Sequence, residues 1–216
     1  MESRKTGYHI AFEGIDGSGL TTHSKLLVRR LREVGFRTEY VKEPTQGPIG
    51  ELIRTYLRKG EIPNHELLAL LFAADRYWNY YLSEKSISKL KEEGFVVISD
   101  RYKYSSIAYQ GAFTDLEWVW QVNSRVPHSD VIIFLDVPVT VALKRIETRV
   151  KNGSVREHYE KREFLEKIRY YYNIVLRKAE KEGVKIIKIN EIIDDRELGI
   201  EEVNSKIYEQ IIKLLH

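Results

Sequence analysis

The chain has 216 residues, of which 43% are hydrophobic, and this is enough for one domain with a sizeable core. Its 35 basic and 32 acidic residues nearly balance, which argues against a general nucleic-acid binder, because such a protein would show a clustered basic face. The absence of cysteine excludes disulfides and thiol chemistry, and the lack of a membrane-length apolar stretch or a signal-peptide core predicts a cytoplasmic protein that binds no membrane.

Apolar runs and stretches of helical periodicity alternate along the chain. The apolar runs predict strands near residues 8–13, 37–42, 95–99, 130–136 and 185–189. The periodic stretches predict helices near residues 20–34, 48–58, 64–92, 103–110, 115–125, 138–150, 160–182 and 200–215. Because strands that alternate with helices form a parallel sheet covered on both faces, we expect one α/β domain, residues 1–216, with five parallel strands. The charged window 149–162 predicts a mobile surface segment such as a lid.

A glycine-rich loop follows the first predicted strand. Gly14, Gly19 and Thr21 match the pattern of a phosphate-binding loop, Gly-x4-Gly-Lys-Ser/Thr, but Leu20 stands where the pattern has lysine. The glycines let backbone N–H groups point at phosphate oxygens, and the next helix adds the positive end of its dipole. The alternative, a glycine-rich turn without a ligand, is disfavoured by the strand before the loop and the helix after it. The loop therefore predicts nucleotide binding with the main phosphate cation missing.

The predicted helix that begins at residue 64 carries an aromatic and a cationic residue on one face. Phe72 and Arg76 are four residues apart, so they lie on the same side of a helix. Together they are suited to stack on a base and to bond its carbonyl oxygen. The alternative is that Phe72 is a core residue and Arg76 is solvated, and the spacing alone favours this alternative.

Two further groups of charged residues suit a phosphate site. Asp100 and Arg101 directly follow the strand 95–99, and ligands of parallel sheets bind at the carboxyl ends of strands. An aspartate there can hold Mg²⁺ and an arginine can clamp a phosphate, whereas the alternative is a surface ion pair. The basic residues around the window 149–162 either form a solvated face or deliver cations as the site closes, and both interpretations stay open.

Taken together, five blocks of this sequence resemble thymidylate kinases, in order and over almost the whole chain. The blocks are Phe12-Glu-Gly-Ile-Asp-Gly-Ser-Gly19, Glu43-Pro44 with Gly47-Pro-Ile-Gly50 and Arg54, Leu71-Phe-Ala-Ala-Asp-Arg76, Asp100-Arg-Tyr102 with Ser105-Ser-Ile-Ala-Tyr-Gln-Gly111, and Asp130-Val-Ile-Ile-Phe-Leu-Asp-Val-Pro138 with Ala142-Leu-Lys-Arg145. The resemblance implies a nucleoside monophosphate kinase of the P-loop NTPase class, with a lid.

The resemblance also implies roles for individual residues. The residues implied to bind ATP are Gly14, Ile15, Asp16, Gly17, Ser18, Gly19, Leu20, Thr21, Thr22 and Arg145. Those implied to bind dTMP are Asp16, Glu43, Pro44, Arg54, Phe72, Arg76, Arg101, Ser105, Tyr109, Gln110 and Glu160, with Phe72 on the thymine, Arg76 at its O4 and Tyr109 against the 2′ carbon. Those implied to be catalytic are Asp16, Thr21, Asp100, Arg101 and a lid arginine, either Arg149 or Arg156, because position 17 is glycine rather than arginine.

The implied reaction transfers the γ-phosphoryl group of ATP to dTMP, with Mg²⁺ held by Thr21 and Asp100, in a protein of a family whose members are commonly homodimers. Leu20 leaves two hypotheses open: the chain is a disabled kinase, or another cation such as Lys42 or a lid arginine replaces the missing lysine. Lys42, Thr45-Gln46 and His158 are further departures from the family pattern. Two other functions also stay open, a broader pyrimidine kinase that accepts dUMP and a nucleotide-binding protein without catalysis.

Overall fold

The computed structural model describes residues 7–59, 64–154, 160–194 and 196–215. Its main sheet has the five parallel strands expected from the sequence, in the order β2-β3-β1-β4-β5. Their bounds are Tyr8–Glu13 for β1, Thr38–Lys42 for β2, Val96–Asp100 for β3, Val131–Asp136 for β4 and Lys185–Asn190 for β5. The prediction of a doubly covered parallel sheet is confirmed.

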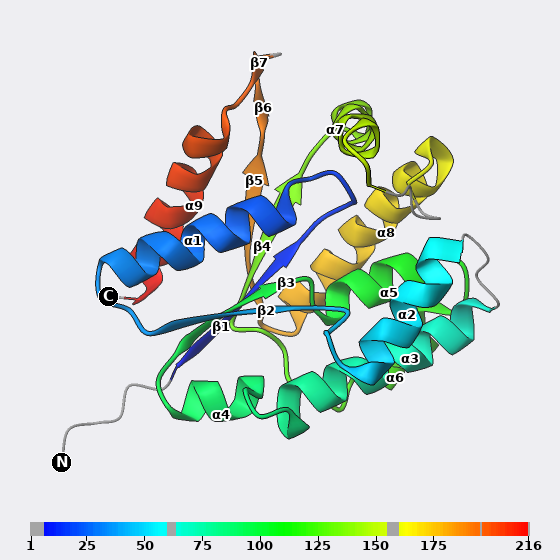
Figure 1. The fold of residues 1–216 in the computed structure, drawn as a ribbon, viewed down its shortest axis with the longest axis horizontal. Coiled ribbons are helices and arrows are strands. Elements are labelled where there is room, and N and C mark those ends of the chain that lie inside the picture. The colour runs from blue at the N-terminus through cyan, green and yellow to red at the C-terminus, as the bar shows by residue number, and fades with distance from the viewer. Residues whose placement is uncertain (1–6, 60–63, 155–159, 195, 216) are drawn as a thin grey trace.

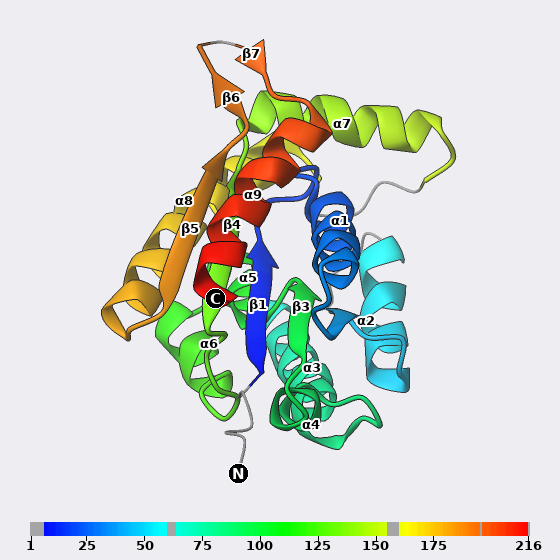
Figure 2. The same cartoon turned by 90° about the vertical axis from the view of Figure 1, so that its left-hand side faces the viewer.

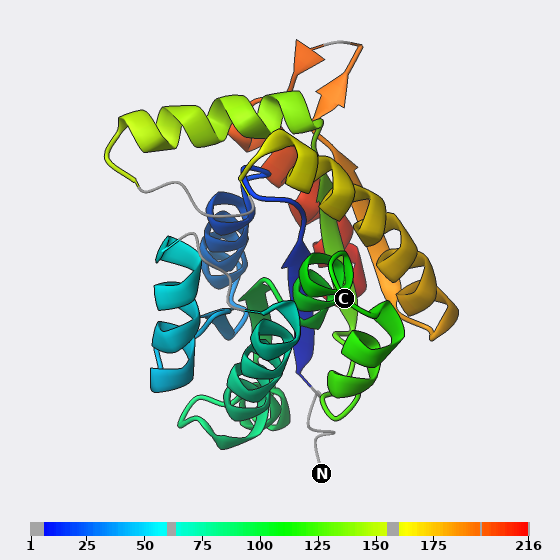
Figure 3. The same ribbon diagram turned by 90° about the vertical axis from the view of Figure 1, so that its right-hand side faces the viewer.

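Helices cover both faces of this sheet. Their bounds are Leu20–Glu33 for α1, Pro48–Lys59 for α2, His65–Tyr77 for α3, Ile87–Glu92 for α4, Lys103–Gly111 for α5, Leu116–Val122 for α6, Val139–Lys151 for α7, Arg162–Lys181 for α8 and Ile200–Leu215 for α9. Helices α1 and α9 lie side by side on one face, and α5 and α8 lie on the other, where Figure 3 shows them in front of the strands (Figures 1, 2 and 3).

The apolar residues of the central strands alternate between two cores, because successive side chains of a strand point to opposite faces. Ile10 and Phe12 face the core under α1 and α9, whereas Ala11 faces the core under α3, α5 and α8. All of the strand residues Ile10–Glu13 and Val96–Asp100 are buried. Burial on both faces explains why these strands appear in the sequence as continuous apolar runs.

One local prediction was wrong, and one short element was not predicted. The stretch 64–92 is not one helix: α3 passes into a π-helical segment, η1, at Trp78–Leu82, and the chain then becomes extended at Ser83 before α4 begins. The polar residues 83–86 interrupt the apolar pattern, and the Ser83 hydroxyl bonds the carbonyl oxygen of Asn79 in competition with regular helix. A short antiparallel hairpin, β6 at Ile192–Ile193 and β7 at Arg196–Glu197, was not expected, because two-residue strands leave no periodic signal.

The parallel strands bring several chain segments to one edge of the sheet. The carboxyl ends of β1, β2 and β3 carry Glu13, Lys42 and Asp100, and Lys42 and Asp100 are partners in the strand register. Helix α7 lies beyond this edge (Figure 2). In open parallel sheets ligands bind at this end of the strands. Among the described residues, no helix is long and apolar enough to cross a membrane.

Candidate active site

The phosphate loop lies between β1 and α1, as the sequence predicts. Gly17 and Gly19 have φ angles of +81° and +88°, which favour glycine, and a Cβ on Gly17 would lie 2.5 Å from the carbonyl oxygen of Ala142. Gly19 is the N-cap residue of α1, so the N-terminal end of that helix faces the loop. The Ser18 hydroxyl is buried and has no hydrogen-bond partner in the described structure. A buried hydroxyl without a partner in such a loop suits a phosphate oxygen.

Most of the residues predicted to bind nucleotides line one cavity of about 270 Å³. The predicted residues that line it are Ile15, Asp16, Gly17, Ser18, Leu20, Thr21, Glu43, Pro44, Arg54, Phe72, Arg76, Asp100, Arg101, Ser105, Tyr109, Gln110, Arg149 and Glu160. Gly14, Gly19, Thr22 and Arg145 are not in its lining, and Arg156 lies outside the described residues. The cavity also has lining residues that sequence reasoning did not single out as a site, including Gln46, Leu57, Tyr102 and Ser106.

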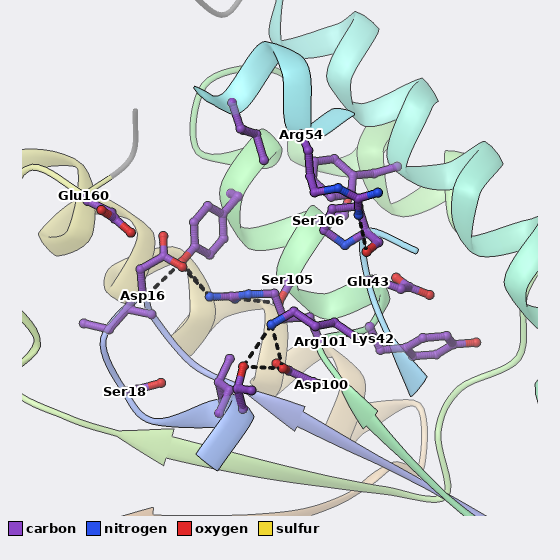
Figure 4. A pocket seen from close by; sticks show the side chains of 18 of the residues that line it. Asp16, Ser18, Lys42, Glu43, Arg54, Asp100, Arg101, Ser105, Ser106 and Glu160 are labelled. Carbon is purple, nitrogen blue, oxygen red and sulfur yellow. Dashed lines mark hydrogen bonds and ion pairs between the residues drawn. The ribbon is translucent and has the colours of Figure 1, made fainter. Parts of the chain in front are cut away.

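Three side chains from three elements meet at the phosphate end of the cavity (Figure 4). The Thr21 hydroxyl donates to Asp100 Oδ2 at 2.5 Å, and Lys42 Nζ lies 2.9 Å from both Thr21 Oγ1 and Asp100 Oδ2. The Tyr40 hydroxyl donates to the same carboxylate oxygen at 2.9 Å. Burial by itself raises the pKa of Asp100, but the Lys42 ammonium and the hydrogen bonds outweigh burial and hold this pKa below its usual value.

The oxygen pair of Thr21 and Asp100 suits Mg²⁺. A hydroxyl and an ionised carboxylate are hard oxygen ligands. Both oxygens already contact a cation, because the Lys42 ammonium lies within 2.9 Å of each. Mg²⁺ usually takes only one or two protein oxygens together with substrate phosphates and water. In the part of the chain that the structure describes, no group of three or more His, Asp or Glu residues forms a metal cage. The pair therefore fits a nucleotide-bound metal better than a metal held by protein alone.

Arg101 is at the centre of the cavity. Its guanidinium donates to Asp16 Oδ1 at 2.5 Å, to the carbonyl oxygen of Gly14 at 3.0 Å and to Ser105 Oγ at 3.0 Å. Its φ angle is +72°, in the left-handed region that a non-glycine residue seldom adopts. Strained backbone of this kind persists where the surrounding contacts hold it, and it is common at active sites. The alternative of an ordinary surface ion pair for Asp100 and Arg101 is wrong, because Arg101 reaches the phosphate loop.

The far end of the cavity is the predicted base site. Arg76 is only 1% exposed, so the alternative in which it is solvated is wrong. Its guanidinium bonds Glu43 Oε2 at 2.8 Å and also the side chain of Asn123. Phe72 is half-buried in the cavity lining, and the side-chain oxygen of Gln110 is buried without a partner in the described structure. An aromatic face, a guanidinium and an unpaired amide oxygen suit a flat ligand with polar edges.

Thr45 and Asp75 hold the loop that carries Glu43 and Pro44. The backbone N–H and the hydroxyl of Thr45 donate to the two carboxylate oxygens of Asp75 at 2.7 and 2.6 Å. Sequence reasoning treated Thr45 only as a departure from the family pattern, which has glycine there, and gave Asp75 no role. The departure has a structural reason, because the hydroxyl adds a buried hydrogen bond that glycine cannot make.

The lid arginines are only partly described. Arg149, near the end of α7, pairs with the buried carboxylate of Glu160, and both residues line the cavity. Arg145 pairs with Glu191 and Glu197 at 2.7 Å each, and its guanidinium lies 3.4 Å from the carbonyl oxygen of Gly17. Because residues 155–159 are outside the described chain, the predicted choice between Arg149 and Arg156 stays open.

Glu13 is a buried carboxyl that sequence reasoning did not assign to the site. Its oxygens accept hydrogen bonds from the Tyr102 N–H at 2.9 Å, the Ser105 hydroxyl at 2.5 Å and the Tyr172 hydroxyl at 3.0 Å. Burial raises its pKa from 4.5 to about 7, although these hydrogen bonds and the Arg101 charge oppose the shift. Glu13 thereby holds Ser105, which in turn contacts Arg101.

The raised pKa of Glu13 makes stability depend on pH. Because the folded state binds more protons than the unfolded state between pH 4.5 and about 7, the Glu13 contribution is present below pH 4.5 and is lost as the pH rises through 7. We expect the free energy of unfolding of the native chain to fall more steeply over this range than that of Glu13→Gln. Denaturant unfolding of both proteins at pH 4.5 to about 8 measures the two slopes, and parallel curves would contradict the assignment.

The sheet order, the phosphate loop and the cavity at the carboxyl ends of the strands together define a P-loop nucleoside monophosphate kinase. The family model described as thymidylate kinase matches residues 12–200. The chain therefore belongs to the thymidylate kinase family.

Similar proteins agree with this assignment. The chain is 45% identical over 206 residues to a protein of Aeropyrum pernix named as a thymidylate kinase, covering 95% of this chain and 96% of the relative. It is 44% identical over 172 residues to a Pyrococcus horikoshii protein named as a thymidylate kinase, covering 77% and 81% of the two chains. The solved structure of thymidylate kinase from Candida albicans aligns with a TM-score of 0.78 at 26% identity, covering 96% of this chain and 92% of that chain.

Proposed function

We propose that this chain transfers the γ-phosphoryl group of ATP to dTMP, giving dTDP and ADP. The single observation that carries the proposal is the continuity of the cavity, whose lining runs from Ser18 and Thr21 of the phosphate loop, past Arg101, to Phe72 and Arg76. The acceptor nucleotide would lie in this cavity with its phosphate near Arg101, and the phosphates of ATP would enter at the phosphate-loop end. Membership in the thymidylate kinase family supports dTMP as the acceptor.

The chemistry of the proposed reaction is charge stabilisation and positioning. An oxygen of the dTMP phosphate forms a bond to the γ-phosphorus, the bond to the bridging β–γ oxygen breaks, and the electron pair stays on the β-phosphate of ADP. The acceptor is already an anionic oxygen, so the step requires no general base. Mg²⁺, held by Thr21 and Asp100, would supply positive charge to the β and γ phosphates. Arg101 and the loop N–H groups would orient the two anions and neutralise their repulsion.

The proposed acceptor site uses the far end of the cavity. Phe72 would stack on the thymine, Arg76 would bond its O4, and the unpaired amide oxygen of Gln110 would accept a hydrogen bond from the base. Tyr109 would lie against the 2′ carbon, where a ribose hydroxyl would not fit. Its hydroxyl already accepts the Asp16 N–H at 3.0 Å, so its ring is fixed near the phosphate loop.

Purified protein incubated with ATP, Mg²⁺ and dTMP should form dTDP and ADP in equal amounts, measured by ion-exchange chromatography. Because one methyl group changes discrimination by about 10- to 200-fold, dUMP should be a slower substrate by a factor in that range. UMP, which adds a 2′-hydroxyl, should be slower than dUMP. Equal rates for dTMP and dUMP would instead favour a broader pyrimidine kinase.

Leu20 favours a second candidate, a protein that binds nucleotides without turnover. Removing a cation from the transferring phosphoryl group typically lowers the rate by about 10²–10³. The same incubation distinguishes the candidates when calorimetric titration with ATP and dTMP accompanies it. Heat of binding for both nucleotides without dTDP formation would support the second candidate.

We also propose that the enzyme is cytoplasmic and that it works as a homodimer. Large apolar side chains are exposed along α3 and η1, namely Leu67, Leu70, Tyr77, Trp78, Tyr81 and Leu82. A second copy that covered this surface would remove it from water. Sedimentation equilibrium measures the mass directly, and a monomer at assay concentrations would contradict this part of the proposal.

A further inference from the structure

Position 20 brings no charge to the phosphate end of the cavity. Leu20 is the first residue of α1, is 5% exposed and belongs to the buried apolar cluster between the sheet and α1. The ammonium that a phosphate loop normally provides from this position is therefore replaced by hydrocarbon.

Lys42 reaches the same place from another element. It is the last residue of β2, next to Asp100 in the strand register, and its Nζ lies 2.9 Å from the hydroxyl of Thr21, the residue that follows Leu20 (Figure 4). Its side chain is 43% exposed and lines the cavity. An ammonium on a flexible four-carbon stem can exchange one anionic partner for another without leaving this end of the cavity.

The other cations in the described cavity lining have different partners. Those cations and their partners are Arg54 with the carbonyl oxygens of Pro44 and Thr45, Arg76 with Glu43, Arg101 with Asp16 and Arg149 with Glu160. Of the described cavity cations, Lys42 is the one that contacts Thr21. Asp100 holds the Lys42 ammonium beside the phosphate loop, where an entering phosphate group can contact it.

We propose that Lys42 is a catalytic residue that supplies, from β2, the cation that the phosphate loop lacks at position 20. This inference rests on the proposed kinase function and names the group that makes turnover compatible with Leu20. In the reaction, the Lys42 ammonium contacts oxygens of the β and γ phosphates and offsets the negative charge on the transferring group. The bonds formed and broken are those given above, and Lys42 neither gains nor loses a proton.

Five chains test the proposal: the native chain, Lys42→Met, Lys42→Arg, Leu20→Lys and the double variant Leu20→Lys/Lys42→Met. Lys42→Met should lower kcat for dTDP formation by about 10²–10³ and leave the KM for dTMP within about threefold. The kcat of the double variant should be at least about tenfold higher than that of Lys42→Met, because the lysine introduced by Leu20→Lys returns the charge to the loop. Lys42→Arg, which keeps the charge, should retain more activity than Lys42→Met.

Binding without metal gives a readout that is independent of turnover. In EDTA, calorimetry measures the affinities for ADP and for a non-hydrolysable ATP analogue. Lys42→Met should weaken binding of the analogue by about tenfold more than binding of ADP, because a charge-assisted contact to the γ-phosphate is lost. Lys85→Met is the matched control: Lys85 forms a 2.9 Å pair with Glu39 of β2 but lies outside the cavity lining, and its replacement should change neither quantity.

The outcomes separate this inference from the proposed function. Unchanged kcat and analogue affinity in Lys42→Met would overturn the inference. So would an effect confined to the KM for dTMP, because Lys42 would then bind the acceptor phosphate instead. If dTDP forms only in chains that carry the Leu20→Lys substitution, the kinase assignment is supported and the proposed role of Lys42 is wrong. If neither the native chain nor Leu20→Lys forms dTDP while both are folded by circular dichroism, the proposed function is wrong.

Discussion

Replacing Arg101 by alanine or glycine is expected to lower kcat for dTDP formation by about 10³, the largest loss of activity that we expect from a single residue. The guanidinium bonds Asp16, the Gly14 carbonyl and Ser105 in the cavity lining, where we propose that it bridges the two phosphates. Steady-state kinetics with saturating ATP and dTMP measures the loss. Arg37→Ala, at an exposed arginine that packs on Phe95, is the control and should leave kcat unchanged.

The two substitutions at position 101 should differ in stability while agreeing in activity. The φ angle of +72° strains alanine but not glycine, so Arg101→Gly should be more stable than Arg101→Ala by about 1 kcal/mol. Denaturant unfolding gives both free energies. Equal stabilities would show that the backbone relaxes when the side chain is removed, and retained activity in either variant would contradict the catalytic role.

The second large effect is expected on stability, from Arg76→Met. Arg76 and Glu43 form a pair that is 1% and 2% exposed, and removal of the guanidinium leaves a buried carboxyl without its cation. Burial raises the pKa of Glu43, and the Arg76 guanidinium opposes that shift, so without Arg76 the carboxyl is forced toward protonation. We expect the free energy of unfolding to fall by about 3–5 kcal/mol. The double variant Arg76→Met/Glu43→Gln should lose less than the sum of the two single variants.

Arg58→Met is the matched control for this prediction. Arg58 pairs with Glu51 at 2.7 Å, but both side chains are more than half exposed, so the same substitution should cost at most about 1 kcal/mol. Calorimetry adds a functional readout: Arg76→Met should lose dTMP binding while ATP binding persists. A loss of stability no larger than that of Arg58→Met would show that the buried pair contributes little.

The sequence predicted the part of the site whose residues are close together in the chain. Gly14, Gly19 and Thr21 form a contiguous motif, and the strand before it and the helix after it have clear periodicity. The position of Asp100 and Arg101 after a predicted strand located them correctly, because the carboxyl ends of parallel strands lie at one edge of the sheet. The single helix predicted over residues 64–92 was wrong because the break at Ser83 depends on local hydrogen bonds rather than on periodicity.

The contacts between distant segments were beyond the sequence pattern. Helical spacing favoured a solvated Arg76, whereas Glu43, Tyr102 and Asn123 surround its guanidinium in the fold. Glu13 and Asp75 received no role, since their partners are 30 to 159 residues away along the chain. In the sequence pattern, a charged residue that becomes buried cannot be distinguished from an exposed one, because the pattern does not identify its neighbours in the fold.

The sequence by itself determined the class of this protein: a parallel α/β kinase fold with a phosphate loop that has leucine in place of lysine, and a candidate metal-binding pair at Thr21 and Asp100. Only the tertiary structure decided which cation lies beside that loop. Lys42 is 21 residues from Thr21 and 58 from Asp100 along the chain, and strand pairing brings its ammonium within 2.9 Å of both. Local patterns record backbone periodicity and turn chemistry, whereas the charge balance of a site depends on strand order and register.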